Sequence, residues 1–398
     1  MEAPKQLALS VSIAVATLAA TSAVAEVTLY DYTEATSDYT DAYVNGQFNA
    51  TDGNGHDQAA YNANLNLSYE KVSSTPDRNI GTRLDANGSI SRASTVGAGS
   101  VSNYTLNGSV TLDNYFRSGS KGAFWYGSGE VGVKKGQDEP FSKIGIGLGY
   151  GRVVNVTPMA KAIRLVEALK QQGALKSTPS KATYQTIANI IARENEYKSK
   201  FGFAKYEQSW ITDIERALVA SGQVNGSLNA AGIIESRDVL VNERISTRKH
   251  GWLVRAGLGL VLTNFDGSDG GDPSLDIGAE YHRPLNNRTQ LSSVASMSSI
   301  YGDDDPSYRF INNLSLTHEM TDKIDWENTW TLDYNKAGTA NANDITNNTL
   351  SSTFRYYLDN QLDLNVTAKA SKLDDGVGNN GNDDVDTSLN VGVSYRLR

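Results

Sequence analysis

The sequence predicts a closed antiparallel β-barrel of about 14 strands, within bounds of about 12 and 16, with an α-helical insert between the sixth and seventh strands. Three observations predict this fold class: apolar and polar residues alternate along many stretches, long connections alternate with short ones, and one central segment changes to helical spacing. The mean hydropathy is −0.41, and the chain has 36 Gly and 20 Tyr but only 8 Pro. Such a composition suits an all-β transmembrane barrel, whose outer face alone is apolar.

The first 25 residues have the organisation of a secretory signal peptide. Lys5 precedes a weakly apolar stretch at 7–18, and Ala23-Val24-Ala25 forms a small-residue cleavage site. An uncleaved transmembrane helix is the alternative, and it is disfavoured because Ser and Thr residues interrupt the apolar stretch. The chain has no cysteine, so we expect burial and hydrogen bonding, rather than disulfides, to hold the exported protein together.

Fourteen stretches have strand character. They lie at about 42–52, 59–73, 80–93, 102–117, 122–135, 141–156, 250–265, 274–284, 289–301, 307–320, 323–335, 347–359, 361–373 and 386–397. The period of two is clear in the second stretch, where Tyr61, Ala63 and Leu65 alternate with asparagines. We assign 26–156 to the first part of the barrel and 246–398 to the second.

The connections between these stretches differ in length from one end of the barrel to the other. Those at one end, such as 266–272 and 374–384, are long and rich in Gly and Asp, whereas those at the other end, such as 76–78 and 359–360, are mostly shorter. This alternation is typical of barrels that cross a membrane. We call the two ends the long-loop end and the short-turn end.

Aromatic residues gather at strand ends on the short-turn side. They are Tyr115, Phe116, Phe124, Trp125, Tyr126, Trp252, Trp326, Tyr356, Tyr357 and Tyr395. Because amphipathic rings prefer the boundary between membrane and water, we interpret this set as an aromatic girdle. Chance placement of core aromatics is the alternative.

Residues 157–245 depart from the period of two and predict helices. Pro158 and Pro179 each follow a Thr, and we interpret each pair as an N-cap followed by the first helical position. Gly173 is expected to end the first helix, a third helix is expected around Trp210, and a shorter fourth is expected from near Ser227. Since the insert follows an even-numbered strand, we expect it at the short-turn end.

The insert is basic although the whole chain is acidic. Residues 157–249 include 14 Lys and Arg against 9 Asp and Glu, while the net charge of the whole chain is −9. A solvated surface is the favoured interpretation. The alternative is that the helices contact anionic lipid head groups, an acidic polymer or a protein partner.

Glycines recur on one face of the two strands that flank the insert. The main candidates are Gly145, Gly147 and Gly149 in the sixth strand and Gly257 and Gly259 in the seventh. Glycine in a strand often marks the close approach of another backbone. One interpretation is a plug, in which part of the insert or the segment 26–40 packs into the lumen here. The other is that the glycines relieve curvature in a closing sheet.

The strand alternation also predicts which charged residues line the lumen. The principal candidates are Arg83, Asp85, Glu130, Lys143, Arg255, Glu280, Arg309, Glu327, Arg355 and Lys369, and the further members are Asp113, Lys134, Asp276, Asp325, Asp333, Asp363 and Arg396. This set has nine acidic and eight basic members. A balanced polar interior either conducts water and small solutes or forms salt-bridge networks that fill the barrel.

The sequence offers little for catalysis. The four histidines are His56, His250, His282 and His318, and neither Gly-x-Ser-x-Gly nor His-Glu-x-x-His occurs. No histidine can be placed beside a nucleophile, so we predict no enzyme, no cofactor, no metal centre and no binding to nucleic acid. The acidic loops at 266–272 and 303–305 raise the alternative of Ca²⁺ or Mg²⁺ binding, but solvated loops are favoured.

The last strand carries a terminal motif. Gly392, Tyr395 and Leu397 form the pattern Gly-x-x-aromatic-x-hydrophobic one residue before the end of the chain. This motif resembles the assembly signal of Gram-negative outer-membrane β-barrel proteins, although Arg398 follows where those proteins usually end. The resemblance is to this porin-like class as a whole. It implies an outer-membrane location, contact with lipid and lipopolysaccharide, and recognition by the barrel-assembly machinery.

Two functions from different classes follow from this sequence. One is a porin-like channel for small hydrophilic solutes, narrowed or gated by the helical insert on the periplasmic side. The other is a non-conducting barrel for assembly or export, whose helical insert docks a periplasmic partner or an envelope polymer. A helical segment of about 90 residues exceeds what a simple porin needs, which keeps the second interpretation open.

Overall fold

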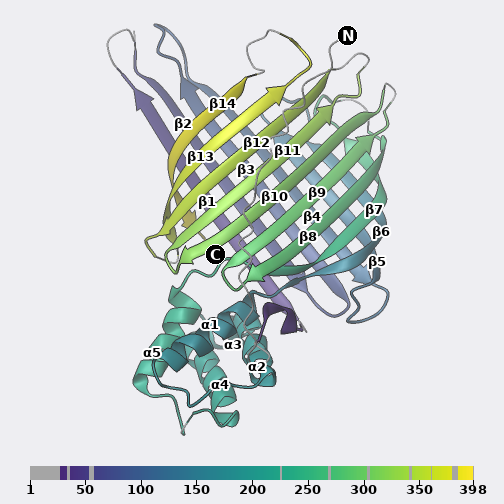
Figure 1. Ribbon diagram of the computed structural model, residues 1–398. Helices are drawn as coiled ribbons and strands as arrows, with labels where there is room; N and C mark the ends of the chain where they lie inside the picture. The colour runs from purple at the N-terminus through teal and green to yellow at the C-terminus, as the bar shows by residue number, and fades with distance from the viewer. Residues whose placement is uncertain are drawn as a thin grey trace, which may run out of the picture.

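Fourteen strands form one closed antiparallel barrel, as the sequence predicts (Figure 1). The structure, a computed structural model, describes residues 27–33, 36–52, 58–224, 226–267, 270–302, 305–339, 343–359, 361–378 and 384–397, so the expected signal peptide lies outside the described residues. The strands are β1 (Ser37–Thr51), β2 (Ala60–Ser74), β3 (Arg78–Arg92), β4 (Val101–Tyr115), β5 (Ala123–Lys134), β6 (Phe141–Asn155), β7 (Lys249–Thr263), β8 (Pro273–Asn286), β9 (Thr289–Ile300), β10 (Ser307–Thr321), β11 (Ile324–Lys336), β12 (Asp344–Tyr357), β13 (Leu362–Asp374) and β14 (Val385–Arg396). Each strand pairs with the next along the chain.

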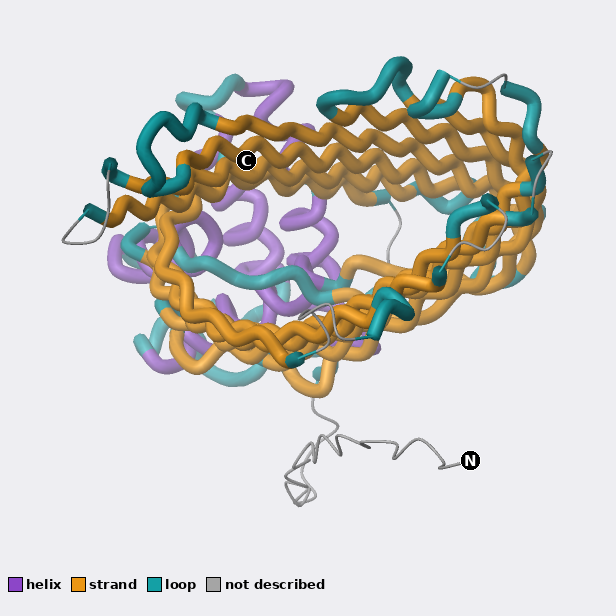
Figure 2. Tube along the Cα trace, turned by 90° about the horizontal axis from the view of Figure 1, so that it is seen from above, coloured by secondary structure: helices purple, strands orange, loops and turns teal. Residues whose placement is uncertain are grey.

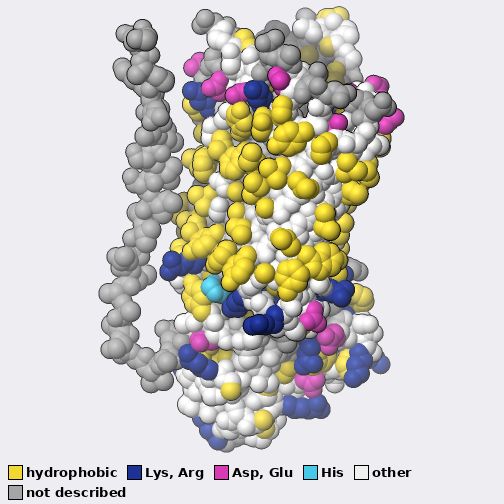
Figure 3. Space-filling model, turned by 90° about the vertical axis from the view of Figure 1, so that its right-hand side faces the viewer, with side chains coloured by type: hydrophobic (Ala, Val, Ile, Leu, Met, Phe, Trp, Pro, Cys, Tyr) yellow, Lys and Arg dark blue, Asp and Glu magenta, His cyan; other side chains and the backbone are white. Residues whose placement is uncertain are grey.

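The outer face of the barrel is apolar. In β6, Ile144, Ile146 and Leu148 are exposed in alternation with glycines, and Leu258 of β7 and Val391 of β14 are exposed by 67% and 69%. On the face of the molecule seen in Figure 3, hydrophobic side chains cover a broad area over the strands, and charged side chains gather at its two ends. A closed sheet leaves no free edge and satisfies its backbone internally, so this surface fits hydrocarbon. The chain is therefore a transmembrane β-barrel.

The barrel closes through a short seam between its first and last strands. Four register pairs join β1 to β14, from Tyr43 with Arg396 to Gly46 with Val393, and the Leu397 amide donates to the Ala42 carbonyl oxygen at 2.8 Å. The terminal motif lies in this seam. Tyr395 and Leu397 point outward, while Gly392 lies beside the Asn365 side chain, which a Cβ atom at that position would approach to 2.9 Å.

The segment between β6 and β7 folds into helices at the short-turn end (Figure 1). They are α1 (Thr157–Gln171), α2 (Lys181–Ala192), α3 (Glu194–Phe201), α4 (Tyr206–Ala220) and α5 (Ala230–Arg237), followed by a π-helical turn at Asp238–Asn242. Both predicted N-caps are wrong by a few residues: Val156 caps α1, and Ser180 caps α2 by accepting from the Thr183 amide. The separate helix α3 was not predicted.

The helices have a hydrophobic core of their own. Apolar stripes on α1, α2 and α4 meet around Leu165, Ile187, Trp210 and Leu218, each fully or almost fully buried. The Trp210 indole N–H donates to the Ile190 carbonyl oxygen at 2.9 Å, which satisfies its polar atom. We call residues 157–242 the helical domain. No helix in the described part of the chain is long and apolar enough to span a membrane.

The segment 27–33 packs against the helical domain. Leu29 and Tyr32 belong to its core cluster, Asp31 pairs with Lys181 of α2 at 3.1 Å, and the Thr33 amide donates to Gln185 at 3.1 Å. The described part of the segment 26–40 therefore lies on the helices and at the start of β1. It forms no plug in the lumen.

The flanking glycines make room for aromatic side chains of the barrel wall itself. A Cβ atom at Gly147 would lie 2.6 Å from the Tyr126 ring, and one at Gly149 would lie 2.2 Å from the Phe124 ring. The remaining nearest atoms belong to β7, because Gly145 and Gly147 pair in register with Gly259 and Gly257. The nearest atoms to all five glycines belong to strands β5 to β8, so close packing within the sheet, rather than a plug formed by the described residues, explains these glycines.

This packing predicts that a side chain added at a closely packed glycine of β6 destabilises the barrel, whereas one added at a glycine with open space around it does not. Replacing Gly149 by Ala should destabilise the barrel by about 1–3 kcal/mol, because the new Cβ atom overlaps Phe124 and the Val254 carbonyl oxygen. Gly81→Ala is the matched control, since a Cβ atom there meets nothing within 4 Å. Urea unfolding of the two variants measures the difference, and equal midpoints would contradict the packing.

The predicted girdle is correct for only part of its set. Five members are exposed on the outer face, where a membrane boundary would meet them, and Trp125 is half-buried; the exposed members are Phe116, Trp252, Trp326, Tyr356 and Tyr395. Four others are buried instead, because they lie on the inward face of their strands: Tyr115, Phe124, Tyr126 and Tyr357. Inward aromatics fill the lumen near the helical domain, so they narrow the barrel rather than anchor it.

Candidate functional site: the lumen and its helical end

The ten principal lumen candidates all lie on the inward face of the barrel. Each has the parity that faces away from the exposed apolar residues of its strand, as Lys143 does beside Ile144. Eight of the ten take part in ion pairs. Of the other two, Asp85 has one Ser and one Asn as register partners in the adjoining strands, and Lys369 has two Ser. Their part in permeation stays a prediction.

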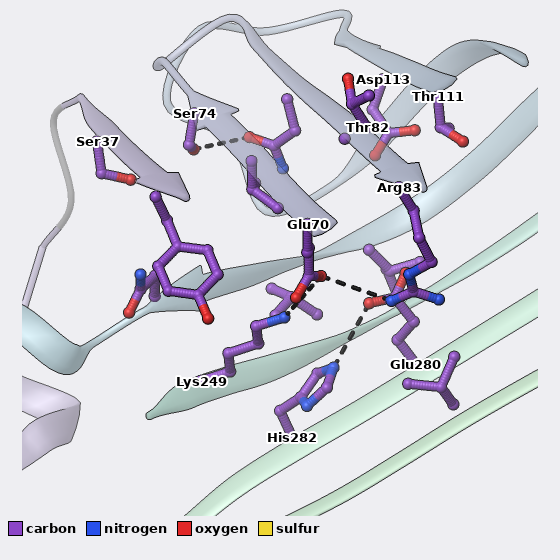
Figure 4. A pocket seen from close by; sticks show the side chains of 18 of the residues that line it. Ser37, Glu70, Ser74, Thr82, Arg83, Thr111, Asp113, Lys249, Glu280 and His282 are labelled. Atoms are coloured by element: carbon purple, nitrogen blue, oxygen red, sulfur yellow. Dashed lines mark hydrogen bonds and ion pairs between the residues drawn. The ribbon is translucent and has the colours of Figure 1, made fainter. Parts of the chain in front are cut away.

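Ion pairs reach between strands that are not neighbours in the sheet. Glu70 of β2 contacts Arg83 of β3 at 3.5 Å and Lys249 of β7 at 3.3 Å (Figure 4). Arg255 of β7 contacts Asp113 of β4 at 2.7 Å. Because β7 is far from β2 and β4 in the strand order, these contacts cross the lumen and constrict it.

Six of the eight predicted inward cations pair with carboxylates. Lys143 contacts Asp276 at 2.7 Å and Glu130 at 3.6 Å, and Arg255 also contacts Glu280 at 2.8 Å. On the other side of the barrel, Arg355 pairs with Glu327 and Asp363, Arg309 pairs with Asp333, and Arg396 pairs with Asp41. Because most of these charges are compensated, they leave little net field in the lumen.

A cavity of about 230 Å³ occupies the lumen near the helical end. Its walls come from β1 to β4 on one side and from β6 to β9 on the other, and Figure 4 shows Glu70, Lys249 and Glu280 turned into it. Ser37, Ser109 and Thr111, which carry hydroxyl groups, line it as well. This lining offers hydrogen-bond donors and acceptors to small polar solutes.

The linker 243–248, which joins the helical domain to β7, runs along the barrel mouth. Arg244 lies over the rings of Tyr43 in β1 and Tyr357 in β12, at 5.2 and 5.9 Å. Thr247 is hydrogen-bonded to the Tyr39 hydroxyl at 2.8 Å. The contacts of the linker with the barrel therefore extend from β1 to β12. Figure 2, viewed from the long-loop end, shows the helices behind part of the barrel opening.

Three buried charged residues and the half-buried Glu243 fasten this linker and α1 to the barrel wall. Arg248, which is fully buried, donates to Glu319 of β10 at 2.6 Å, and Arg164 of α1 pairs with both Glu319 and Glu243. The Ser246 amide also donates to Glu319, at 2.8 Å. We call Arg164, Glu243, Arg248 and Glu319 the latch. The latch joins residues that are far apart in the sequence, and no local sequence pattern predicts it.

Burial shifts the pKa values of two latch residues that lie outside the strands, Glu243 and Arg248. It raises the pKa of the Glu243 carboxyl above its ordinary value, although the Arg164 guanidinium acts in the opposite direction. Burial also lowers the pKa of Arg248 to about 10, so Arg248 stays charged at neutral pH. A neutral Glu243 is therefore favoured more in the docked domain than in the free chain.

This shift predicts a pH dependence of docking. A carboxyl with a raised pKa in the folded state stabilises that state at low pH, and the contribution is lost as the pH rises through the raised pKa. The thermal midpoint of the helical circular-dichroism signal should thus be higher at mildly acidic than at neutral pH. Glu243→Gln should reduce that difference, and an unchanged difference would rule out Glu243 as its source.

One cluster of reactive residue types was missed. The His282 ring contacts Ser292 at 2.9 Å and Glu280 at 3.4 Å. Register could have revealed it, because the tight β8–β9 hairpin pairs His282 with Ser292. The arrangement lacks other parts of a hydrolase. Glu280 is shared with Arg255, Ser292 is absent from the cavity lining, and the strand amides nearby belong to the β-ladder instead of an oxyanion hole.

Comparison with known proteins gives similarity of architecture alone. No family model matches the sequence, and a search of characterised proteins finds no match. An outer membrane channel from Pseudomonas putida F1 is 9% identical, with 91% of this chain and 94% of that chain covered and a TM-score of 0.35. A loop-deletion mutant of OmpT, an outer membrane protein of Vibrio cholerae, is 8% identical, with 91% and 100% covered and a TM-score of 0.32. Omp33 of Acinetobacter baumannii is 8% identical, with 91% and 99% covered and a TM-score of 0.29.

These likenesses are distant, and no functional argument rests on them. The closed 14-strand barrel, its apolar outer face and its polar, charge-lined lumen are features of this chain itself. They are the features of the Gram-negative outer-membrane β-barrel class. The chain has the fold of that class.

Proposed function

We propose that this protein is a channel for small hydrophilic solutes in the outer membrane of a Gram-negative bacterium, narrowed at its periplasmic mouth by the helical domain. The observation that carries the proposal is the charge-balanced lumen, with its polar cavity of about 230 Å³ leading toward the helical end. A barrel with a purely structural role does not need an open polar cavity in its interior. Signal-peptide cleavage after Ala25 and insertion by the barrel-assembly machinery belong to the same proposal.

Solute uptake tests this proposal. Proteoliposomes that contain the refolded residues 26–398 should swell in isotonic solutions of small neutral sugars and amino acids, with rates that fall steeply as solute size increases. Charged solutes of either sign should enter at similar rates, because the lumen charges compensate each other. Liposomes that hold the folded protein but swell no faster than empty ones would end the channel proposal.

A second candidate function is a non-conducting barrel whose helices dock a periplasmic partner. The observation in its favour is the helical domain itself, which has its own core and yet exposes Phe203 and Ile234 by 70% and 62%. Affinity purification from envelope extracts, with and without the helical domain, separates the two functions. A partner lost on deletion, together with absent solute uptake, would favour docking.

We expect no hydrolytic activity from the Ser292, His282 and Glu280 contacts. Ser and His are held within the barrel wall, and the nucleophile has no preorganised donors for a developing oxyanion. The contacts instead position Glu280 for Arg255 in the lumen.

A further inference from the structure

Two cavities meet at the helical end of the barrel, beneath the ends of β1 and β2. The first is the lumen cavity. The second has a volume of about 510 Å³ and lies between the strand ends at 36–38 and 73–75 and the helical residues 192–200, most of which belong to α3. Ser37 and Ser74 line both cavities, so they stand at the boundary between the lumen and the space beside the helical domain.

The boundary is formed by two small side chains. Ser37 and Ser74 are register partners at the ends of β1 and β2, and both are buried. Ser74 is fixed in place, because its hydroxyl donates to Asn79 at 2.7 Å and accepts from Arg152 at 3.2 Å. Serine side chains are small and polar. The partition between the two cavities is therefore thinner and more polar than one formed by a pair of larger side chains.

The latch closes a different part of the mouth. It holds the β10 side through Glu319, and the linker adds contacts to Asp325, Tyr357 and, on β1, Tyr39. The lumen cavity borders β1 to β4 and β6 to β9, and its lining includes no latch residue. A solute in that cavity therefore meets the Ser37–Ser74 boundary on the side that the latch leaves free.

Helix α3 forms the outer lip of the second cavity. No residue of α3 is fully buried, and Tyr197 alone of this helix packs against the core of the helical domain, so we expect α3 to move more easily than α1, α2 and α4. The cavity is lined by two acidic and two basic residues, Asp38, Glu196, Arg193 and Lys200. Like the lumen, it carries charges of both signs.

We propose that solutes leave the lumen sideways, through a portal between the ends of β1 and β2 and α3, with Ser37 and Ser74 at its narrowest point. The mixed charges of both cavities suit small polar solutes that are neutral or zwitterionic, because an ion of either sign meets repulsion along the path. This inference rests on the proposed channel function and adds the route and the class of solute.

Single cysteines test the portal, because the chain has none of its own. Ser199 lies exposed in the wall of the second cavity, so Ser199→Cys should leave conductance unchanged until a bulky, uncharged methanethiosulfonate reagent is attached. Attachment should then reduce the single-channel conductance at least about twofold, and dithiothreitol should restore it. Arg216→Cys on α4, whose parent side chain is 75% exposed and lies outside the cavity lining, is the matched control and should be insensitive.

The outcomes separate the portal from the channel. If both unlabelled variants conduct like the unmodified protein and the label at position 199 has no more effect than the label at 216, the portal is wrong and the channel stands. If neither the variants nor the unmodified protein conducts, the channel proposal fails and the portal fails with it. A block confined to position 199, and reversed by reduction, supports the portal.

Discussion

Removing the helical domain should increase the single-channel conductance several-fold. Asn155 and Lys249 are register partners at the ends of β6 and β7, so an Asn-Gly turn in place of 156–248 converts the two strands into an ordinary hairpin. The deletion removes the linker from the mouth and leaves all 14 strands in place. Planar-bilayer recordings of the deletion variant and the full chain, each shown to be folded by heat-modifiable gel mobility, provide the measurement.

The same deletion should make the channel prefer cations. It takes Arg164 and Arg248 away from Glu319, and it takes Ser246 away from Asp325, so two carboxylates face the widened mouth without partners from the insert. Reversal potentials in a salt gradient report this preference. A deletion variant that also carries Glu319→Gln and Asp325→Asn is the control: it should keep the larger conductance and lose the selectivity. Unchanged conductance on deletion would show that the helical domain does not narrow the pore.

Glu319→Gln in the full chain should release the helical domain from the barrel. The substitution leaves Arg248 and Arg164 buried without a carboxylate from β10, and breaking one side of a buried ion pair typically costs about 3–5 kcal/mol. Because the domain has its own core, it should stay helical while its linker becomes accessible. Limited proteolysis between 243 and 248 should therefore speed up, and the conductance should rise toward that of the deletion variant.

Asp333→Asn is the matched control for the latch. It removes the carboxylate from the inward pair with Arg309, whose side chains are 59% and 36% exposed, and such exposed pairs contribute only about 0–1 kcal/mol. The control should leave both proteolysis and conductance unchanged. Equal behaviour of the Glu319→Gln and Asp333→Asn variants would mean that the latch does not hold the domain.

The strands were predictable because their signal is local. Each strand repeats polar and apolar residues with a period of two, and a barrel exposes one parity to lipid and the other to its lumen. The same alternation would have corrected the prediction of the aromatic girdle. Phe124 and Tyr126 share parity with Glu130, which was assigned inward, and Tyr357 shares parity with Arg355. Consistent use of parity would have placed these rings in the lumen and explained the glycines opposite them.

The latch and the portal could not be predicted in the same way. Arg164 and Glu319 are separated by most of the helical domain, three complete strands and most of β10, and nothing in the neighbourhood of either residue specifies the other. In the sequence, the linker looks like an ordinary polar connection. Only the docking of the helices places it across the mouth of the barrel. These contacts depend on how the helical domain is placed relative to the barrel. The alternation of residues along a single strand or helix carries no information about that placement.

Single-channel conductance of the refolded residues 26–398 in a planar bilayer tests the central claim most directly. The account predicts discrete steps with weak preference between anions and cations, because the lumen carries paired charges around a polar cavity. A silent bilayer, with the barrel shown to be folded by heat-modifiable mobility, would contradict the channel and leave the helical domain as the functional part of the molecule.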